Sequence, residues 1–209
     1  MKLYYFDTLQ PRKVCAVAKY LKAPVEYVYV DPLKGELRSP GYLALNPNGK
    51  VPTLTDGERT LWEADAMIMC ALAAQMNSDL WPHDARHIDV IRWFSWNSQH
   101  FNRAGGALYF EHMVKARFRL GEPNAAEVER ALQDFRGYAG ILNDHLRGKR
   151  WLLGDSLTLA DFSVAGVLPF AEGSRMPLRE FPEVSRWHDQ LNAIEAWRNP
   201  YPARQQNAA

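Results

Sequence analysis

The chain has 209 residues, 47% of them hydrophobic, and a formal net charge of +1 at pH 7. These values predict one large or two small globular domains, and they exclude a disordered chain and a general electrostatic attraction to nucleic acid or an anionic membrane. The two cysteines make no disulfide framework, and no apolar stretch approaches the roughly 20 residues that cross a bilayer. We therefore expect a cytoplasmic protein.

The beginning of the chain predicts a strand, a helix and a second strand. Residues 2–6 are rich in aromatic side chains, which is typical of a buried strand. Pro11 suits the first turn of a helix, and apolar residues then recur at helical spacing to about residue 22. The alternation over residues 25–30 predicts the second strand. A strand, helix and strand of these lengths form a βαβ unit with a right-handed crossover.

A loop and a hairpin follow. Residues 31–45 are polar and irregular. Residues 51–54 and 60–62 have the composition of short strands, and the Asp56-Gly57 pair between them is a strong hairpin-turn signal. These two strands would pair with each other in antiparallel fashion.

One proline and one apolar run complete the first predicted domain. Pro52 cannot donate a hydrogen bond to a neighbouring strand, so its strand begins there or lies at a sheet edge. The apolar run over residues 66–72 predicts a buried helix. Together these elements predict a thioredoxin-like βαβ-ββα domain over residues 1–76.

Strand signals are missing from the rest of the chain, which predicts an all-helical second domain over residues 85–209. Residues 77–84 are mostly turn formers and predict a linker. Apolar residues recur at helical spacing on both sides of Gly105-Gly106, where we expect a kink or a break. The longest regular pattern covers residues 128–147.

A second motif lies near the C-terminal end of the predicted helical domain. Thr158 and Asp161 have the spacing of an N-terminal capping box, which predicts a structural role for both residues. The helix that follows, over residues 159–171, is nearly all apolar and should lie in the core. Residues 186–197 predict a last helix, and we expect a loose tail after Pro200.

Two motifs resemble those of one enzyme family. Residues 46–66 contain Asn-Pro-x-Gly-Lys-Val-Pro-x-Leu, then Asp-Gly, then Leu-Trp-Glu-x-Asp-Ala. This series is similar to the glutathione-binding core of cytosolic glutathione transferases, and the capping box resembles the one buried in their helical domain. The similarity extends to bacterial Ser/Thr-type members of the theta-, phi- and nu-like classes. It implies a cytosolic homodimeric enzyme that uses glutathione as co-substrate and needs no cofactor.

The resemblance also implies positions for the groups that bind glutathione. A cis peptide bond is implied before Pro52, and a basic group for the glycine carboxylate is implied at Arg38. Further contacts are implied at Lys50, Val51, Glu63 and Ala64. Ala64 stands where the family usually has Ser, so one hydrogen bond of about 0.5–1.5 kcal/mol is missing, although the backbone N–H can still bind the γ-glutamyl carboxylate.

The implied reaction uses the thiolate of glutathione, and a free thiol with a pKa near 8.5 is only partly ionised at neutral pH. A hydroxyl and the N–H groups at a helix start favour the charged sulfur. In Ser/Thr-type relatives this hydroxyl lies six residues before a Val that follows Arg or Lys, which implies Thr8 as the catalytic residue and Gln10 as a second donor. Tyr5 is the rival hydroxyl, and a plain helix cap is the alternative role for Thr8. The carboxylate of Asp7 disfavours a thiolate unless it points away.

An electrophilic substrate needs an apolar surface near the thiolate. Aromatic residues gather in the first long helices of the second domain, and we expect Trp96, Phe101 and Phe110 to line such a pocket. The resulting hypothesis is a transferase that joins glutathione to a small electrophile. Two alternatives stay open, namely a glutathione-dependent disulfide reductase or peroxidase, and a binding module that has the fold without the chemistry. The histidines have no metal-ligand spacing, so we predict no metal site.

Overall fold

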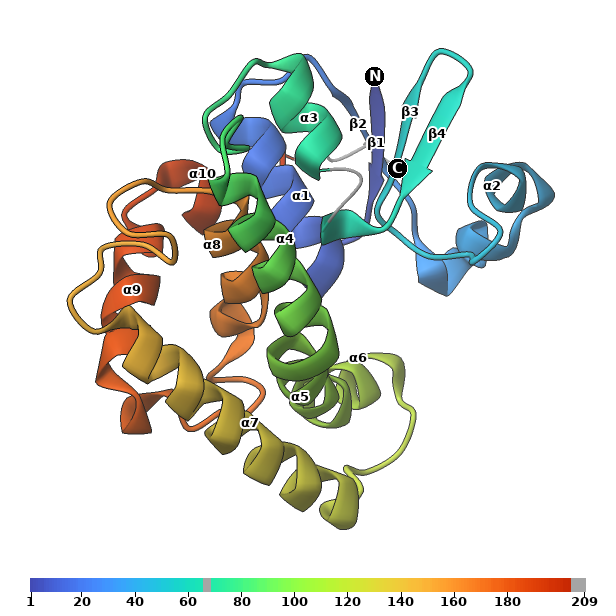
Figure 1. Cartoon of the computed structure of the whole chain (residues 1–209). Coiled ribbons are helices and arrows are strands. Elements are labelled where there is room, and N and C mark those ends of the chain that lie inside the picture. The colour runs from blue at the N-terminus through green and yellow to red at the C-terminus, as the bar shows by residue number, and fades with distance from the viewer. Residues whose placement is uncertain (66–68, 204–209) are drawn as a thin grey trace. The chain divides into compact units, whose positions relative to one another are not determined.

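The computed structural model describes residues 1–65 and 69–203, and their contacts form two compact units (Figure 1). The first unit contains Met1–Asn77 together with the segment from Ile194 onward, and the second contains Ser78–Ala193. The sequence placed everything after residue 85 in the helical domain. The difference arises because the last helix, α10 (Glu195–Arg198), packs on the first helix of the chain, α1 (Leu9–Tyr20).

A four-stranded mixed sheet forms the centre of the first unit. Its strands are β1 (Lys2–Tyr5), β2 (Glu26–Tyr29), β3 (Thr53–Asp56) and β4 (Arg59–Trp62). The spatial order is β2-β1-β3-β4, with β1 parallel to β2 and antiparallel to β3, and with β3 and β4 joined as a hairpin. The predicted thioredoxin-like arrangement is therefore confirmed, and β3 begins directly after Pro52.

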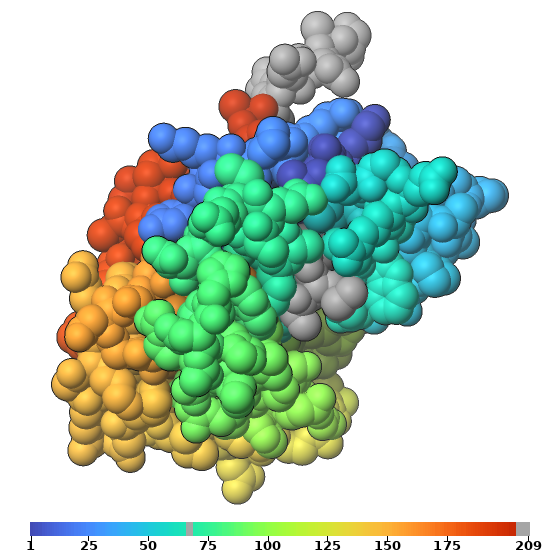
Figure 2. All heavy atoms as spheres, turned by 45° about the horizontal axis from the view of Figure 1, so that its top comes forward, coloured from blue at the N-terminus to red at the C-terminus, as the bar shows by residue number. Residues whose placement is uncertain are grey.

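Besides α10, the described residues of this unit form three α-helices, and two short 3-10 helices, Pro32–Lys34 and Glu36–Arg38, lie between β2 and α2. Helix α1 connects the parallel strands β1 and β2, α2 (Pro40–Leu45) lies in the segment before β3, and α3 (Met69–Gln75) follows β4. Residues 66–68, where we predicted that the last of these helices begins, lie outside the described residues. In Figures 1 and 2 the segment that carries α2 lies beside the β3–β4 hairpin at the surface.

Helix α1 is buried on nearly every side. Its residues Val14, Cys15 and Val17 are completely inaccessible, and even Lys13 has no exposed surface. Contacts with β1, α3 and α10 account for this burial. The N-terminal end of α1 is consequently held by several elements at once, which matters for the site described below.

The second unit is helical throughout its regular elements. It contains α4 (Arg86–Trp96), α5 (Asn102–Tyr109), α6 (Lys115–Phe118), α7 (Ala125–Leu146), α8 (Leu159–Val164) and α9 (Pro182–Asn192). Helix α7 begins where the sequence supplies a cap, because the side chain of Asn124 accepts hydrogen bonds from the N–H groups of Ala126 and Glu127 at 3.0 and 3.3 Å. Within the described residues, no helix has both the length and the apolar content to cross a membrane.

The predicted break at Gly105-Gly106 is wrong. Two π-helical turns, Asn97–Phe101 and Phe110–Val114, join α4, α5 and α6 into one helical path, and both glycines lie within α5. Gly105 is needed for close packing rather than for a kink. A Cβ atom at this position would lie only 3.0–3.1 Å from three side-chain atoms of Val167.

This contact predicts opposite effects for two neighbouring glycines. Gly105→Ala should destabilise the protein by about 1–3 kcal/mol, because an added methyl group forces a well-packed core apart. Gly106→Ala is the matched control, since no atom lies within 4 Å of its added Cβ. It should stabilise α5 by about 0.5–1 kcal/mol through helix propensity. Urea unfolding of both variants measures the difference, and equal effects would contradict the packing role of Gly105.

The capping box at Thr158 and Asp161 is confirmed, and its carboxylate is completely buried. Asp161 Oδ2 accepts hydrogen bonds from the backbone N–H of Thr158 at 2.9 Å and from its hydroxyl at 3.2 Å. Asp161 Oδ1 accepts from the N–H of Leu152 at 2.9 Å and from Trp187 Nε1 at 3.0 Å. Burial raises the pKa of Asp161 to about 6, against the opposing effect of these bonds.

The C-terminal part of the fold differs from the prediction at three points. Helix α8 ends at Val164, well before residue 171, and a 3-10 helix that contains Pro169 continues it. The predicted last helix is divided at Ile194, whose backbone is extended, into α9 and α10. The tail after Pro200 is not loose as far as it is described, since Tyr201 is half-buried and packs on the first unit.

Candidate functional site

Three loops of the first unit meet at one edge of the sheet. Thr53, the first residue of β3, pairs with Tyr4 on one side and with Trp62 on the other. The end of β1, the start of β3 and the end of β4 are therefore level with one another. Neighbouring strands lie about 4.8 Å apart, so these loops span about 10 Å, which is close to the length of an extended tripeptide.

Thr8 lies in the loop after β1 and is the N-terminal capping residue of α1. Its backbone is extended, with φ −132° and ψ 177°, but its side chain donates or accepts no capping hydrogen bond. The backbone is fixed on three sides. The Thr8 N–H donates to the carbonyl of Phe6 at 2.8 Å, and the Thr8 carbonyl accepts from the N–H of Arg12 at 3.1 Å and from the hydroxyl of Tyr201 at 3.2 Å. The half-buried hydroxyl of Thr8 is thus held in place without serving α1.

The rival hydroxyl, Tyr5, is 3% exposed. Its ring stacks on Tyr201, with centroids 5.7 Å apart, and meets the ring of Tyr29 edge-on at 5.5 Å. This residue has the surroundings of a core side chain. Thr8 stays the predicted catalytic hydroxyl.

The loop before β3 is supported from inside by a buried hydrogen-bond network. The backbone carbonyl of Lys50 accepts from the hydroxyl of Tyr42 at 2.7 Å and from Asn46 Nδ2 at 2.8 Å. The completely buried hydroxyl of Thr53 lies 3.0 Å from both of these side-chain groups. The Val51–Pro52 peptide bond is cis, as the resemblance implied. The loop therefore presents the exposed side chain of Lys50 and the half-buried Val51 from a fixed backbone.

Arg38 reaches the same loop from the segment that follows β2. A Cβ atom built on Gly49 would lie 2.7 Å from Arg38 Nη1 and 3.0 Å from the carbonyl oxygen of Leu37. Gly49 has a φ of +57°, so it supplies both the left-handed backbone and the space that the guanidinium occupies. The predicted basic group is thus packed against the predicted binding loop.

The loop after β4 contains a strained backbone. Glu63 has a φ of +72°, which is unusual for a residue other than glycine and recurs at binding sites. Its side chain is exposed, whereas Ala64 is 6% exposed. Asp65, next in sequence, forms an ion pair with the buried Lys13 of α1. This ion pair connects the segment that contains Glu63 and Ala64 to α1, the helix that begins after Thr8.

Comparison with known proteins identifies the family. The profile of the glutathione S-transferase N-terminal domain matches residues 1–69, and that of the C-terminal domain matches residues 125–202. Glutathione S-transferase 3 of Zea mays is 31% identical to this chain, with 97% of the chain and 94% of the maize protein covered. The chain belongs to the glutathione transferase family.

Other relatives agree with this assignment. Glutathione S-transferase 2 of Schizosaccharomyces pombe is 29% identical, with 89% of this chain and 87% of that protein covered. The crystal structure of glutathione transferase F7 from Populus trichocarpa superposes with a TM-score of 0.87 at 25% identity, covering 95% and 96% of the two chains. A transferase family member from Pseudomonas fluorescens, solved with two glutathione molecules bound, has the same fold, with a TM-score of 0.83, 23% identity and 95% and 91% coverage.

The transferase has no cysteine suited to act as its own nucleophile. Cys15 is completely buried, and burial raises the pKa of its thiol. Burial, together with the negative charge of Asp65, raises the pKa of Cys70 to about 12. Burial disfavours the ionised form of both thiols, so neither cysteine has the surroundings of a reactive nucleophile.

Two polar residues flank Thr8. The carboxylate of Asp7 accepts a long hydrogen bond of 3.4 Å from the hydroxyl of Tyr29 on β2, which orients it toward that strand. Gln10 is the second residue of α1 and is half-buried. The Asp7 carboxylate, whose charge would disfavour a nearby thiolate, therefore has a hydrogen-bond partner in Tyr29. Gln10 lies in the first turn of α1, where we predicted a second donor.

The aromatic residues predicted to line an electrophile pocket occupy different positions in the second unit. Phe101 is completely buried and stacks on Phe135 at 5.1 Å, so its ring lies in the helical core. Trp96 covers Phe101 at 5.9 Å, and Phe110 is 44% exposed. Phe101 has no surface to offer a ligand, so its predicted place in the pocket is wrong. The prediction for Trp96 and Phe110 stays a prediction.

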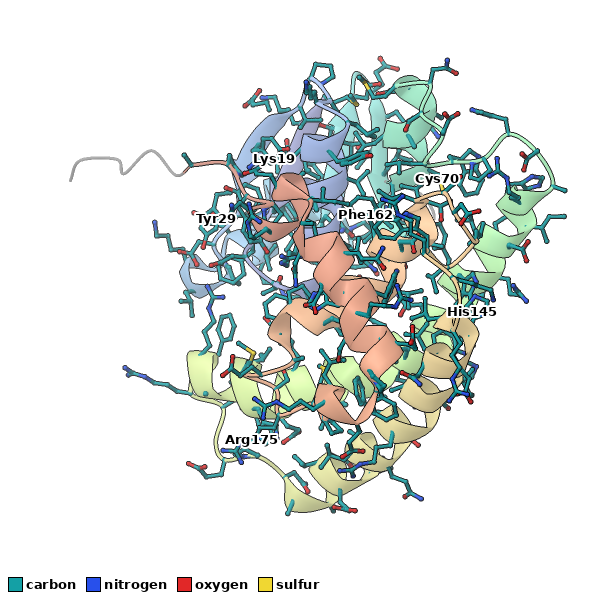
Figure 3. All side chains as sticks on the ribbon, turned by 90° about the vertical axis from the view of Figure 1, so that its left-hand side faces the viewer. Lys19, Tyr29, Cys70, His145, Phe162 and Arg175 are labelled. Atoms are coloured by element: carbon teal, nitrogen blue, oxygen red, sulfur yellow. The ribbon has the colours of Figure 1, made fainter. Side chains whose placement is uncertain are left out.

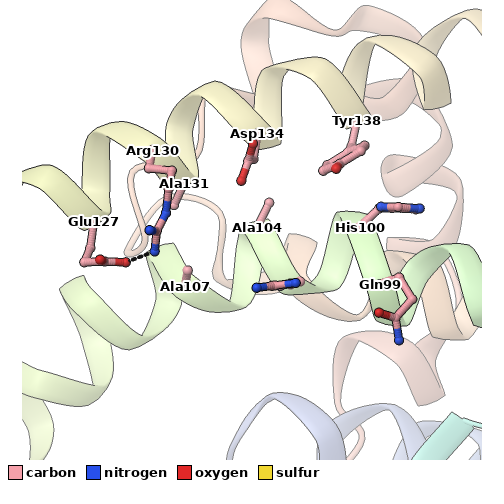
Figure 4. Close-up of a pocket in the computed structure, with 10 residues that line it drawn as sticks. Gln99, His100, Ala104, Ala107, Glu127, Arg130, Ala131, Asp134 and Tyr138 are labelled. Carbon is pink, nitrogen blue, oxygen red and sulfur yellow. Dashed lines mark hydrogen bonds and ion pairs between the residues drawn. The ribbon is translucent and has the colours of Figure 1, made fainter.

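A cavity of about 330 Å³ does lie in this unit, between the α4–α5 path and α7 (Figure 4). None of the three predicted aromatic residues lines it. Both acidic and basic side chains line the cavity, including the ion pair between Glu127 and Arg130. The rings of His100 and Tyr138 lie 4.8 Å apart at one end of it. Across residues 1–65 and 69–203, no group of three or more His, Cys, Asp or Glu side chains is arranged to hold a metal ion.

Proposed function

We propose that this transferase joins the thiolate of glutathione to a small electrophilic molecule. The observation that supports this function best is the meeting of three loops at one sheet edge. One loop carries the Thr8 hydroxyl, which its own helix does not use, and the others carry Val51 and Ala64. Glutathione is the co-substrate, and the chemistry requires no cofactor.

Each part of glutathione has a matching group along this edge. The backbone of Val51 pairs with the extended tripeptide as an added strand would. The N–H of Ala64 and the exposed Glu63 bind the γ-glutamyl end, while Arg38 and Lys50 supply positive charge for the glycine carboxylate. Gln10 donates near the cysteinyl part. The tripeptide is then bound by groups whose positions are fixed before it arrives.

The sulfur of this bound tripeptide lies at the start of α1. The Thr8 hydroxyl donates to the sulfur, and the N–H groups of the first helical turn add positive potential. Both interactions favour the thiolate and lower the thiol pKa. The thiolate then attacks the electrophilic carbon, a C–S bond forms, and the leaving group departs with the bonding electron pair. We propose a cytoplasmic homodimer as the working state.

One set of assays separates this function from its alternatives. The purified protein is tested for retention on immobilised glutathione and then assayed with a chlorinated aromatic, a hydroperoxide and a small disulfide. Retention and turnover of the chlorinated aromatic support the transferase. Retention with turnover of the disulfide or hydroperoxide alone would replace it with a reductase or peroxidase. A protein with neither retention nor turnover would be a module that has the fold without the chemistry.

The buried network beneath the Lys50–Val51 loop predicts a binding defect. Thr53→Val removes the hydroxyl that contacts both Tyr42 and Asn46, and it should raise KM for glutathione by at least about threefold to tenfold, the factor that corresponds to a single lost buried hydrogen bond. The turnover number should change little, because the Thr8 turn is untouched. Thr55→Val on the same strand is the matched control. A similar KM in both variants would show that the network does not position the loop.

A further inference from the structure

The C-terminal segment of the chain packs against α1. Lys19, which is labelled in Figure 3, lies near the end of α1. It donates to Glu195 at 3.0 Å and to the carbonyl of Asn199 at 2.7 Å. Farther toward the start of the helix, Arg12 Nη2 donates to the carbonyl of Trp197 at 2.6 Å. The segment thus contacts α1 both near its C-terminal end and near its start.

The Arg12 contact is buried and has two components. Besides the hydrogen bond, the guanidinium carbon lies 4.6 Å from the centre of the Trp197 ring, within range of a cation–π interaction. Arg12 is 8% exposed and Trp197 has no exposed surface. Burial lowers the pKa of Arg12 to about 10, so the side chain stays charged at neutral pH. A buried, charged contact of this kind fixes the position of α10 on α1.

Tyr201 is the last contact of this segment, and it reaches the predicted catalytic turn. Its hydroxyl donates to the Thr8 carbonyl at 3.2 Å, and its ring stacks on Tyr5, the last residue of β1, with planes 18° apart. The two contacts hold the chain on both sides of the Asp7–Thr8 turn. The same carbonyl also accepts from Arg12, the residue whose side chain holds Trp197.

We infer that Tyr201 is a positioning residue for Thr8, and that the C-terminal segment sets the reactivity of the bound sulfur by fixing this turn. The inference rests on the proposed function, because it needs the Thr8 hydroxyl to face the thiol. The hydroxyl of Tyr201 contacts the backbone carbonyl of Thr8 and not its side chain. It acts through the backbone, where a small rotation of the Thr8 carbonyl would move the hydroxyl away from the sulfur.

Replacing the hydroxyl alone tests this inference. Tyr201→Phe keeps the ring that stacks on Tyr5 and removes the donor to Thr8. We expect kcat to fall about threefold to tenfold with little change in KM for glutathione, which corresponds to one hydrogen bond in the reacting complex. The ultraviolet absorbance of the bound thiolate, measured against pH, should show a raised thiol pKa. A role confined to folding would leave that pKa unchanged.

Tyr27→Phe is the matched control, since Tyr27 also meets the ring of Tyr5, with centroids 6.0 Å apart, and lies on β2. It should leave kcat and the thiol pKa unaltered. If Tyr201→Phe has the same kcat and thiolate titration as the unaltered protein, the inference is wrong. A second variant, Tyr201→Ala, tests the contribution of the ring that stacks on Tyr5, and it should lower kcat further. An unchanged thiol pKa in this variant would also overturn the inference.

Failure of this inference differs from failure of the proposed function. Thr8→Val is assayed in parallel, and its loss of turnover establishes that the hydroxyl matters. Loss in Thr8→Val without an effect in Tyr201→Phe rejects only the positioning role. Full turnover in Thr8→Val removes Thr8 from the mechanism, and the positioning role of Tyr201 is rejected with it.

Discussion

Replacing Asp161 with alanine is expected to lower the free energy of unfolding by about 3–5 kcal/mol, a larger loss than we expect for Gly105→Ala. The change removes the acceptor of four hydrogen bonds and leaves the buried N–H groups of Leu152, Thr158 and Trp187 without it. It also releases the start of α8 from the segment before it. Urea unfolding at pH 7 measures the loss, with Asp155→Ala as a control from the same segment.

Asparagine at the same position separates shape from charge. Asp161→Asn keeps one oxygen for the donors of Leu152 and Trp187, but its amide group faces the N–H of Thr158. The free energy of unfolding of this variant should therefore lie between that of the unaltered protein and that of Asp161→Ala. The ordering of the three proteins is the test. A loss in the asparagine variant equal to that in the alanine variant would show that the remaining oxygen contributes no stability.

The difference in stability between the unaltered protein and Asp161→Asn should depend on pH, and the raised pKa of Asp161 determines its direction. The folded-state pKa of Asp161 is raised from 3.8 to about 6, so the folded protein binds the proton more readily than the unfolded chain between these values. The stability contributed by this group is therefore largest below pH 3.8 and falls as the pH rises to about 6, by up to about 3 kcal/mol. The stability of the unaltered protein relative to Asp161→Asn should fall over this window, and a rise would contradict the raised pKa.

Asp161 also illustrates what a sequence pattern can predict. The three-residue spacing between Thr158 and Asp161 lies within one helical turn, so local geometry alone identifies the capping box. The bond from Trp187 comes from a helix 26 residues farther along the chain, and no local pattern contains it. The βαβ unit and the β3–β4 hairpin were predictable for the same reason as the box, since short spacings determine both. The binding role of the loop before β3 was instead implied by the resemblance to a family.

The residues that the sequence did not predict act through long-range contacts. Lys13 is a charged residue in a helical pattern, and its burial follows from α3, α10 and the Asp65 carboxylate, none of which the pattern of α1 specifies. Gly105 was expected to break a helix because glycine is a poor helix former, but close packing against Val167 decided its role. Tyr201 follows a proline near the chain end, where composition predicts a loose tail, and only the fold brings it to Thr8.

Replacing Thr8 with valine is expected to produce the largest loss of activity. Valine has the same branched shape without the hydroxyl, so kcat/KM for conjugation should fall about 10²- to 10³-fold, as when one preorganised donor to a reacting anion is removed. Retention on immobilised glutathione should persist, because Val51, Ala64 and Arg38 are untouched. Thr8→Ser restores a hydroxyl at the same place and should keep most of the activity.

Because the Thr8 side chain makes no capping bond, this experiment separates an effect on catalysis from an effect on stability. A threonine that caps a helix contributes about 1–2 kcal/mol to stability, and its removal would confuse lost folding with lost catalysis. The Thr8 side chain makes no such bond to α1, so Thr8→Val should unfold at nearly the same urea concentration as the unaltered protein. The bound thiol should at the same time titrate at a higher pH. Normal turnover in a folded Thr8→Val protein would transfer the role to another donor, and Tyr5→Phe would then be the variant to compare.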